Sequence, residues 1–115
     1  MLNDDRMVRI LGGAILLVSL GALAPARADA PKVALALQNH QFVPAELAIP
    51  ANTKVELVIS NRQQTPAEFE SSSLHREKVV PPGATASVFV GPLDPGKYEF
   101  FDDFNSQTRG HLVVK

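Results

Sequence analysis

Apolar residues alternate with small or polar residues in several short segments of the chain. The alternation is clear in residues 33–37 and 55–60, and residues 84–90, 97–101 and 111–114 are also rich in apolar side chains. A period of two over a few residues is typical of a β-strand with one buried face. Pro, Gly, Asn and Asp, which favour turns, separate these segments. The pattern therefore predicts a series of short strands.

The spacing of these segments indicates one all-β domain. Short strands at intervals of about 8 to 12 residues, with turns between them, are typical of a β-sandwich or a barrel. Eight of the nine prolines lie at or after Pro31, where they would break most helices. We therefore predict a sandwich of about seven to eight short strands over residues 31–115, with a small open barrel as the alternative.

The first thirty residues have the pattern of a secretory signal peptide. Arg6 and Arg9 precede an apolar run at residues 10–24, and Ala28 and Ala30 form an A-x-A cleavage site. The alternative is a retained membrane anchor, but fifteen apolar residues in a helix span about 22 Å, short of a hydrocarbon core of about 30 Å. We expect a signal peptide at residues 1–30 and a mature domain that works in a bacterial periplasm.

Composition narrows the chemistry that the chain can perform. It contains no Cys, which excludes disulfides, thiolate metal ligands and a cysteine nucleophile. The net charge is -1, and no basic groove accompanies Phe100, Phe101 and Phe104, so we do not expect nucleic-acid binding. No Gly-rich phosphate loop or nucleophile motif is present either, so an enzyme is not our first expectation.

The order of several motifs resembles that of a cupredoxin. The first half of the resemblance is carried by residues 40–47 (HQFVPAEL), 49–53 (IPANT) and 55–61, and the second half by residues 81–83 (PPG), 95–100 (PGKYEF) and 109–114 (RGHLVV). It covers essentially all of residues 31–115. The resemblance implies a cupredoxin-like Greek-key β-sandwich.

The resemblance does not extend to the copper ligands of that family. A blue-copper centre uses an early His after a Pro, and then a Cys, a His and a Met in one late loop. These positions fall on Ala67, Asp102, Asn105 and Thr108. Since soft sulfur and imidazole ligands select copper, the sequence excludes a type-1 copper electron carrier.

A narrower group of proteins is more similar. Residues 68–71 (EFES), 77–80 (EKVV), 91–93 (GPL) and 100–104 (FFDDF) resemble a cysteine-free class of periplasmic cupredoxin-like proteins, which includes the small component of bacterial ferrous-iron uptake systems. The resemblance implies metal handling, of iron or copper, in support of a membrane iron permease or another periplasmic uptake component. Members often have a His where this chain has Asn105.

Asp102 and His40 are the first candidate metal ligands. Asp102 stands at the cysteine position, where a carboxylate favours oxygen-loving ions such as Fe or Mn over Cu(I). Alternatively, it caps backbone amides or pairs with Arg109. His40 precedes a Phe-x-Pro turn that lies at the metal-bearing end of cupredoxins, and imidazole is the commonest metal ligand. Its alternative is a hydrogen bond to a loop carbonyl.

Glu68 and Glu70 are the second candidate site. They are two residues apart on an expected strand, so they share one face, where Asp103 and Glu77 can join them to receive a cation. The alternative is a solvated face balanced by cations, and the candidates for that role are Arg62, Arg76 and Lys78.

Two functional hypotheses follow from these residues. In the first, the protein binds iron or copper through His40, Asp102, Asp103, Glu68 and Glu70, and transfers the metal or helps to oxidise it for a permease. In the second, a cupredoxin scaffold has lost its metal and serves as a protein-binding module. The loss of all four blue-copper ligands favours the second hypothesis.

Overall fold

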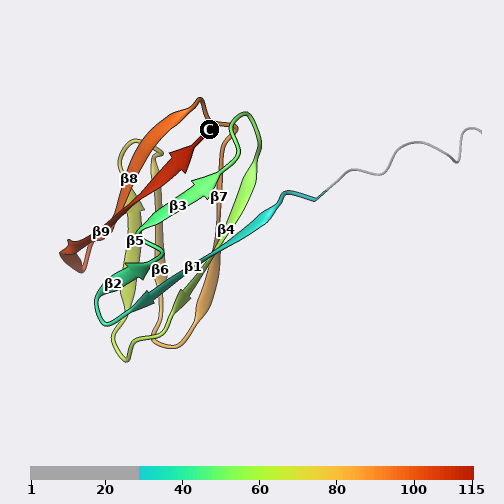
Figure 1. Cartoon of the computed structure of the whole chain (residues 1–115). Helices are drawn as coiled ribbons and strands as arrows, with labels where there is room; N and C mark the ends of the chain where they lie inside the picture. Colours follow the sequence, from blue (N-terminus) through green and yellow to red (C-terminus); the bar gives the residue numbers. More distant parts are fainter. Residues whose placement is uncertain (1–28) are drawn as a thin grey trace, which may run out of the picture.

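Nine β-strands and no helix make up residues 29–115, the part of the chain that the computed structural model describes (Figure 1). The strands are β1 (Lys32–Gln38), β2 (Gln41–Val43), β3 (Glu46–Ile49), β4 (Val55–Asn61), β5 (Ala67–Ser71), β6 (Arg76–Val80), β7 (Thr85–Val90), β8 (Gly96–Asp102) and β9 (Asn105–Val114). The expected signal peptide at residues 1–30 lies almost wholly outside this part of the chain. Residues 29–115 contain no helix that is long and apolar enough to cross a membrane.

Two mixed sheets form the domain. The four-stranded sheet has the order β2-β1-β4-β7, and the five-stranded sheet has the order β3-β9-β8-β5-β6. β1 pairs with β4 and β3 with β9 in parallel, whereas the other pairs are antiparallel. The predicted all-β Greek-key sandwich is therefore confirmed, with nine strands where about seven to eight were expected.

The core lies between the two sheets and follows the alternation in the sequence. Every second residue of β4, from Val55 to Asn61, is buried, and β5 buries Ala67, Phe69 and Ser71 in the same way. Three phenylalanine rings from different strands meet at the centre. The ring of Phe42 stands edge-on to that of Phe100, with centroids 4.8 Å apart, and the ring of Phe69 stacks on Phe100 at 5.3 Å.

A two-residue turn joins β1 to β2, close to the expected site. Gln38 pairs with Gln41, and both intervening residues, Asn39 and His40, have positive φ (52° and 58°), as a type I′ hairpin turn requires. Figure 1 shows this turn near the loop that joins β4 to β5, at the opposite end of the sandwich from the C-terminus. The fold thus brings His40 beside a loop more than twenty residues later in the sequence.

Candidate functional site

Asp102 is buried at the end of β8, with only 2% of its surface exposed. Its Oδ1 accepts hydrogen bonds from the backbone N–H of Glu68, at 2.9 Å, and of Phe104, at 3.0 Å. The carboxylate therefore ties the start of β5 to the turn between β8 and β9. This is the backbone-capping role that the sequence left open as an alternative, and Arg109 pairs with Glu99 rather than with Asp102. A metal-binding role for Asp102 remains a prediction.

The other three positions that hold copper ligands in blue-copper proteins also carry no sulfur or imidazole ligand here. Thr108, at the methionine position, is buried, and its Oγ1 donates a hydrogen bond of 2.7 Å to the carbonyl of His40. Ala67 is buried in the core, and Asn105 is partly exposed. Without a thiolate, a thioether or an imidazole at any of the four positions, these residues do not fit a type-1 copper ion. Two of them instead hold the surrounding loops.

His40 and Asp102 both line one pocket of about 320 Å³. Thr65, Pro66, Phe104 and Asn105 line the rest of it. The expected alternative for His40 is a hydrogen bond from its side chain to a loop carbonyl. The side chain is exposed and forms no such bond with residues 29–115. Its backbone carbonyl is instead the acceptor for Thr108.

Four carboxylates gather on the outer face of the five-stranded sheet, and we call Glu68, Glu70, Glu77 and Asp103 the carboxylate cluster. The ligand oxygens of Glu68, Glu70 and Asp103 all lie within 4.8 Å of one another. Glu77 is the cross-strand partner of Glu70, and the N–H of Asp103 donates to the carbonyl of Glu68 at 2.8 Å. Strand alternation predicted from sequence that Glu68 and Glu70 share a face, where Asp103 and Glu77 could join them. The pairing of β5 with β6 places Glu77 beside Glu70.

The surroundings of Glu68 and Glu70 favour their protonated forms. Loss of hydration raises the pKa of Glu68 above its ordinary value of 4.5, and the charge of Glu77 and a hydrogen bond with Asp103 raise it further. Loss of hydration also raises the pKa of Glu70, followed by the charges of Asp103 and Glu77. Like charges held close together oppose ionisation, so a cation between these groups would relieve the repulsion.

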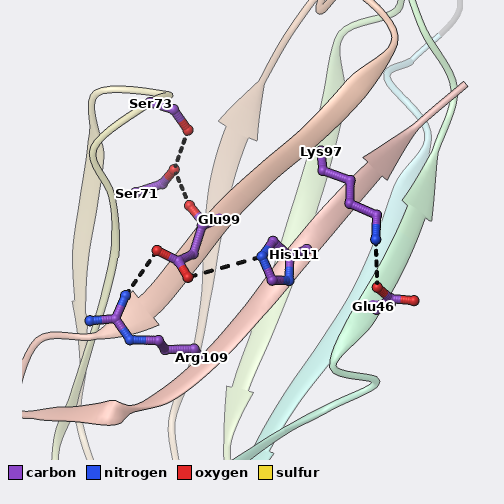
Figure 2. Close-up of polar contacts among 7 residues, drawn as sticks. All are labelled: Glu46, Ser71, Ser73, Lys97, Glu99, Arg109 and His111. Carbon is purple, nitrogen blue, oxygen red and sulfur yellow. Dashed lines mark hydrogen bonds and ion pairs between the residues drawn. The ribbon is translucent and has the colours of Figure 1, made fainter.

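No cation of residues 29–115 forms an ion pair with the carboxylate cluster. The ion pairs of this part of the chain are Lys97–Glu46 at 3.3 Å, Arg109–Glu99 at 2.9 Å and His111–Glu99 at 4.0 Å, all on the outer face of the same sheet (Figure 2). Arg109 also lies over the ring of Phe101, at 4.8 Å from its centroid.

The cations proposed to balance the cluster are engaged elsewhere or form no ion pair. Arg76 donates from Nε to the carbonyl of Phe89 at 2.9 Å and from Nη1 to the carbonyl of His75 at 3.1 Å. Neither Arg62 nor Lys78 pairs with a carboxylate in residues 29–115. The solvated face balanced by these three residues is therefore not formed through direct ion pairs.

The donor set of the cluster determines which cations it suits. Metal–oxygen bonds of about 2.0–2.6 Å allow one ion to reach several oxygens that lie within 4.8 Å of one another. Carboxylates without sulfur or nitrogen ligands favour hard cations over Cu(I). The sequence predicts these residues but not Gln63, whose side chain accepts a hydrogen bond from the backbone of His40. No local pattern marks such a residue.

Comparison with known proteins agrees with this architecture. The model of the cupredoxin-like domain family matches residues 10–114 of the chain. The uncharacterized protein RP394 of Rickettsia prowazekii (strain Madrid E) is 43% identical over 84 residues, which are 72% of this chain and 67% of that protein.

Solved structures with the same fold include copper proteins. The metal-binding domain of the Cu(I)-exporting P-type ATPase CopA of Streptococcus pneumoniae D39, solved with Cu(I), superposes with a TM-score of 0.69 and 13% identity, over 80% of this chain and 92% of that one. Amicyanin from Paracoccus versutus gives 0.58 and 18%, over 82% and 87%. A purple cupredoxin from Nitrosopumilus maritimus gives 0.56 and 18%, over 76% and 100%. The chain belongs to the cupredoxin-like domain family, as a member without the cysteine that a blue-copper site requires.

Proposed function

We propose that this protein is a periplasmic metal-handling domain that binds a hard cation at its carboxylate cluster and supports iron uptake. The observation that carries the proposal is the convergence of Glu68, Glu70 and Asp103 within 4.8 Å, with no ion pair to balance them in residues 29–115. The raised pKa of Glu68 and Glu70 supports it, because a cation would remove the repulsion that raises both values.

The metal and the partner follow from chemistry and from the family resemblance. Oxygen ligands favour Fe²⁺, Fe³⁺, Mn²⁺ or Cu²⁺ over Cu(I). Iron is our first choice because the cysteine-free class that the chain resembles serves ferrous-iron uptake. The protein would bind the ion and transfer it to a membrane iron permease or another periplasmic component, and helping to oxidise the ion would need a redox partner. Export through the signal peptide at residues 1–30 would place it in the periplasm.

A metal-free scaffold that binds another protein is the second candidate function. Asp102 and Thr108 use the old ligand positions to hold backbone groups, as expected of a scaffold that no longer holds copper. Phe104 beside the cluster is 56% exposed, and exposed aromatic side chains are common at protein interfaces.

A thermal melt with added metal separates these functions. The purified protein is melted alone and with Cu²⁺, Mn²⁺ or, without oxygen, Fe²⁺, because an ion that binds only the folded state raises the Tm. We expect a selective rise, with an affinity that falls at least tenfold in Glu70→Gln. Glu46→Gln, which removes a carboxylate from the same sheet face outside the cluster, is the matched control and should leave the affinity unchanged.

Two other outcomes would redirect the proposal. If Asp102→Asn abolishes binding and Glu70→Gln does not, the ion binds in the His40–Asp102 pocket and not at the cluster. If no ion changes the Tm, the metal-handling function is refuted and the protein-binding scaffold remains.

A further inference from the structure

Two members of the carboxylate cluster come from segments far apart in the sequence. Glu68 is the second residue of β5, and Asp103 lies in the turn between β8 and β9. The register of β5 with β8 contains two pairs, Phe69 with Asp102 and Glu70 with Phe101. Glu68 and Asp103 therefore lie one residue beyond the last pair, where the regular ladder does not by itself fix the distance between them.

The backbone beyond the last pair forms half of the next step of the ladder. The N–H of Asp103 donates to the carbonyl of Glu68 at 2.8 Å, as in a hydrogen-bonded antiparallel pair. In a complete pair, the N–H of Glu68 would donate in return to the carbonyl of Asp103. It donates instead to Oδ1 of Asp102, at 2.9 Å. A side-chain oxygen thus replaces the backbone acceptor at the point where β8 ends.

The same oxygen of Asp102 also holds the other side of the turn. It accepts the N–H of Phe104, the residue after Asp103, at 3.0 Å. Asp103 is therefore anchored through its own N–H by Glu68 and through the next N–H by Asp102. Because Asp102 is buried, water competes little for these charge-assisted hydrogen bonds. The backbones of Glu68 and Asp103 are thus fixed relative to each other.

Asp102 supports the cluster without belonging to it. The ligand oxygens that lie within 4.8 Å of one another come from Glu68, Glu70 and Asp103. Like charges held this close repel one another, so their segments need other contacts to keep them together. Ligands that are in place before an ion arrives lower the entropy cost of binding it. Removal of a group that orients metal ligands typically costs about 10- to 100-fold in metal affinity.

We propose that Asp102 is a positioning residue of the carboxylate cluster, and that it holds the backbones of Glu68 and Asp103 so that their carboxylates bind one cation. The proposal rests on the metal-binding function proposed above. It assigns the effect to the two hydrogen bonds that Oδ1 accepts, and not to the charge of Asp102 or to a bond between Asp102 and the metal.

The Mn²⁺ affinity of Asp102 variants tests this role. The EPR signal of free Mn²⁺ measures binding to each purified protein at pH 7, at a temperature where unfolding curves show that the protein is folded. Asp102→Ala removes the acceptor and should weaken the affinity about tenfold or more. Asp102→Asn keeps an oxygen that can accept both N–H groups, so we expect it to lose less than about threefold.

A third variant keeps the test valid if Asp102→Ala does not fold. Asp102→Ser retains a hydroxyl oxygen, but its side chain is too short to reach both the N–H of Glu68 and that of Phe104. We expect its Mn²⁺ affinity to fall between the affinities of Asp102→Ala and Asp102→Asn.

Thr108→Val is the matched control for the loss of a buried hydrogen bond. Thr108 is also buried, and its Oγ1 donates to the carbonyl of His40 at 2.7 Å, in a turn that carries no member of the cluster. This variant should have a lower Tm than the wild type but the same Mn²⁺ affinity.

The outcomes separate the positioning role from metal binding itself. If the wild type binds Mn²⁺ and neither Asp102→Ala nor Asp102→Ser binds it more weakly, the positioning role is refuted and the function of the cluster stands. If Asp102→Asn loses as much affinity as Asp102→Ala, the charge of Asp102 or a direct bond to the metal is responsible, and the proposal is also refuted. If the wild type binds none of the ions used in the thermal melt, both proposals fall.

Discussion

His40 has a backbone conformation that is unusual for a residue with a side chain. Its φ is 58°, and left-handed conformations cost residues other than glycine roughly 1–2 kcal/mol. The hydrogen bonds that its backbone forms with Gln63 and Thr108 offset this cost. Glycine is common at this position of a two-residue hairpin turn. The imidazole thus stands at a position where glycine is the more usual residue.

Replacing His40 with glycine tests whether the imidazole contributes to stability. Glycine relieves the strain of the positive φ but also loses more entropy on folding, so the two effects oppose each other. We expect His40→Gly to change the free energy of unfolding by less than about 1 kcal/mol. Urea denaturation measures this change. A loss well above that value would show that the imidazole serves the fold and would weaken its assignment to a binding site.

Sequence predicts which side chains share a strand face, but not which backbone groups they bind. The grouping of Glu68 with Glu70 follows from the alternation of β5 alone. In contrast, the hydrogen bond from Glu68 to Asp102 joins residues 34 positions apart, and that from Thr108 to His40 joins residues 68 positions apart. Contacts of this length depend on how the sheets pack, which no local pattern contains.

At the level of the elements, β9 packs tightly against its neighbours at one glycine. A Cβ atom on Gly110 would lie 2.7 Å from the carbonyl oxygen of Ala45 and 2.7 Å from the ring of Phe100. Both neighbours are fixed, since Ala45 accepts a backbone hydrogen bond from His111, and Phe100 is fully buried between two other rings. There is therefore no space for a side chain at position 110, and glycine is required there.

We expect Gly110→Ala to destabilise the protein by roughly 3 kcal/mol, as overpacking of a filled core does. Gly83→Ala is the control, because its Cβ would meet nothing within 4 Å, although its φ of 70° adds a local strain of about 1 kcal/mol. Thermal or urea unfolding of both variants gives the comparison. If the two variants lose the same free energy of unfolding, the core around residue 110 can shift to make room for the added methyl group.

The strand segments expected from sequence omitted β2, β3 and β6. β2 and β3 are three and four residues long, too short to show a clear alternation. β6 is exposed at four of its five positions, so it carries no alternation that could reveal it. β9 was expected at residues 111–114 but begins at Asn105. Arg109 pairs with Phe101 and Asn105 pairs with Asp102, so residues 106–108 fall in the irregularity between these two pairs. The central strands, β1 and β4, were predicted well because both bury alternate residues.

Across the whole molecule, charge is distributed unevenly. The net charge is only -1, yet the carboxylate cluster lies on the outer face of one sheet. No carboxylate lines the cleft between the β1–β2 turn and the β4–β5 loop, which is formed by residues 39–40 and 62–65. Sequence predicted the near-neutral total but not this separation. The separation follows from the order of the strands, which sets β5 beside β6 and β8.

The cluster should make stability depend on pH. Because the folded state raises the pKa of Glu68 and Glu70, their protonation favours folding: this contribution is complete below the ordinary value of 4.5 and is lost as the pH rises through the folded-state values. Glu70→Gln should therefore be more stable than the wild type at pH 7, in the absence of metal, and should lose that advantage below about pH 4.

Urea unfolding between pH 3 and 8 measures this dependence. Glu46→Gln, which removes the partner of Lys97, should show no gain at pH 7. A Glu70→Gln protein that is no more stable than the wild type at neutral pH would show that the four carboxylates do not repel one another appreciably.

The position of β9 has a consequence for how the chain acquires its structure. β9 lies between β3 and β8 in the five-stranded sheet, and its parallel partner β3 precedes it by about sixty-five residues, as in the pair Glu46 and His111. Such long-range pairing slows folding. A chain that emerges from its amino end, whether from a ribosome or from a translocation channel, therefore cannot complete this sheet until β9 has emerged. Until then β3 and β8 lack their shared partner, and their unpaired edges favour aggregation.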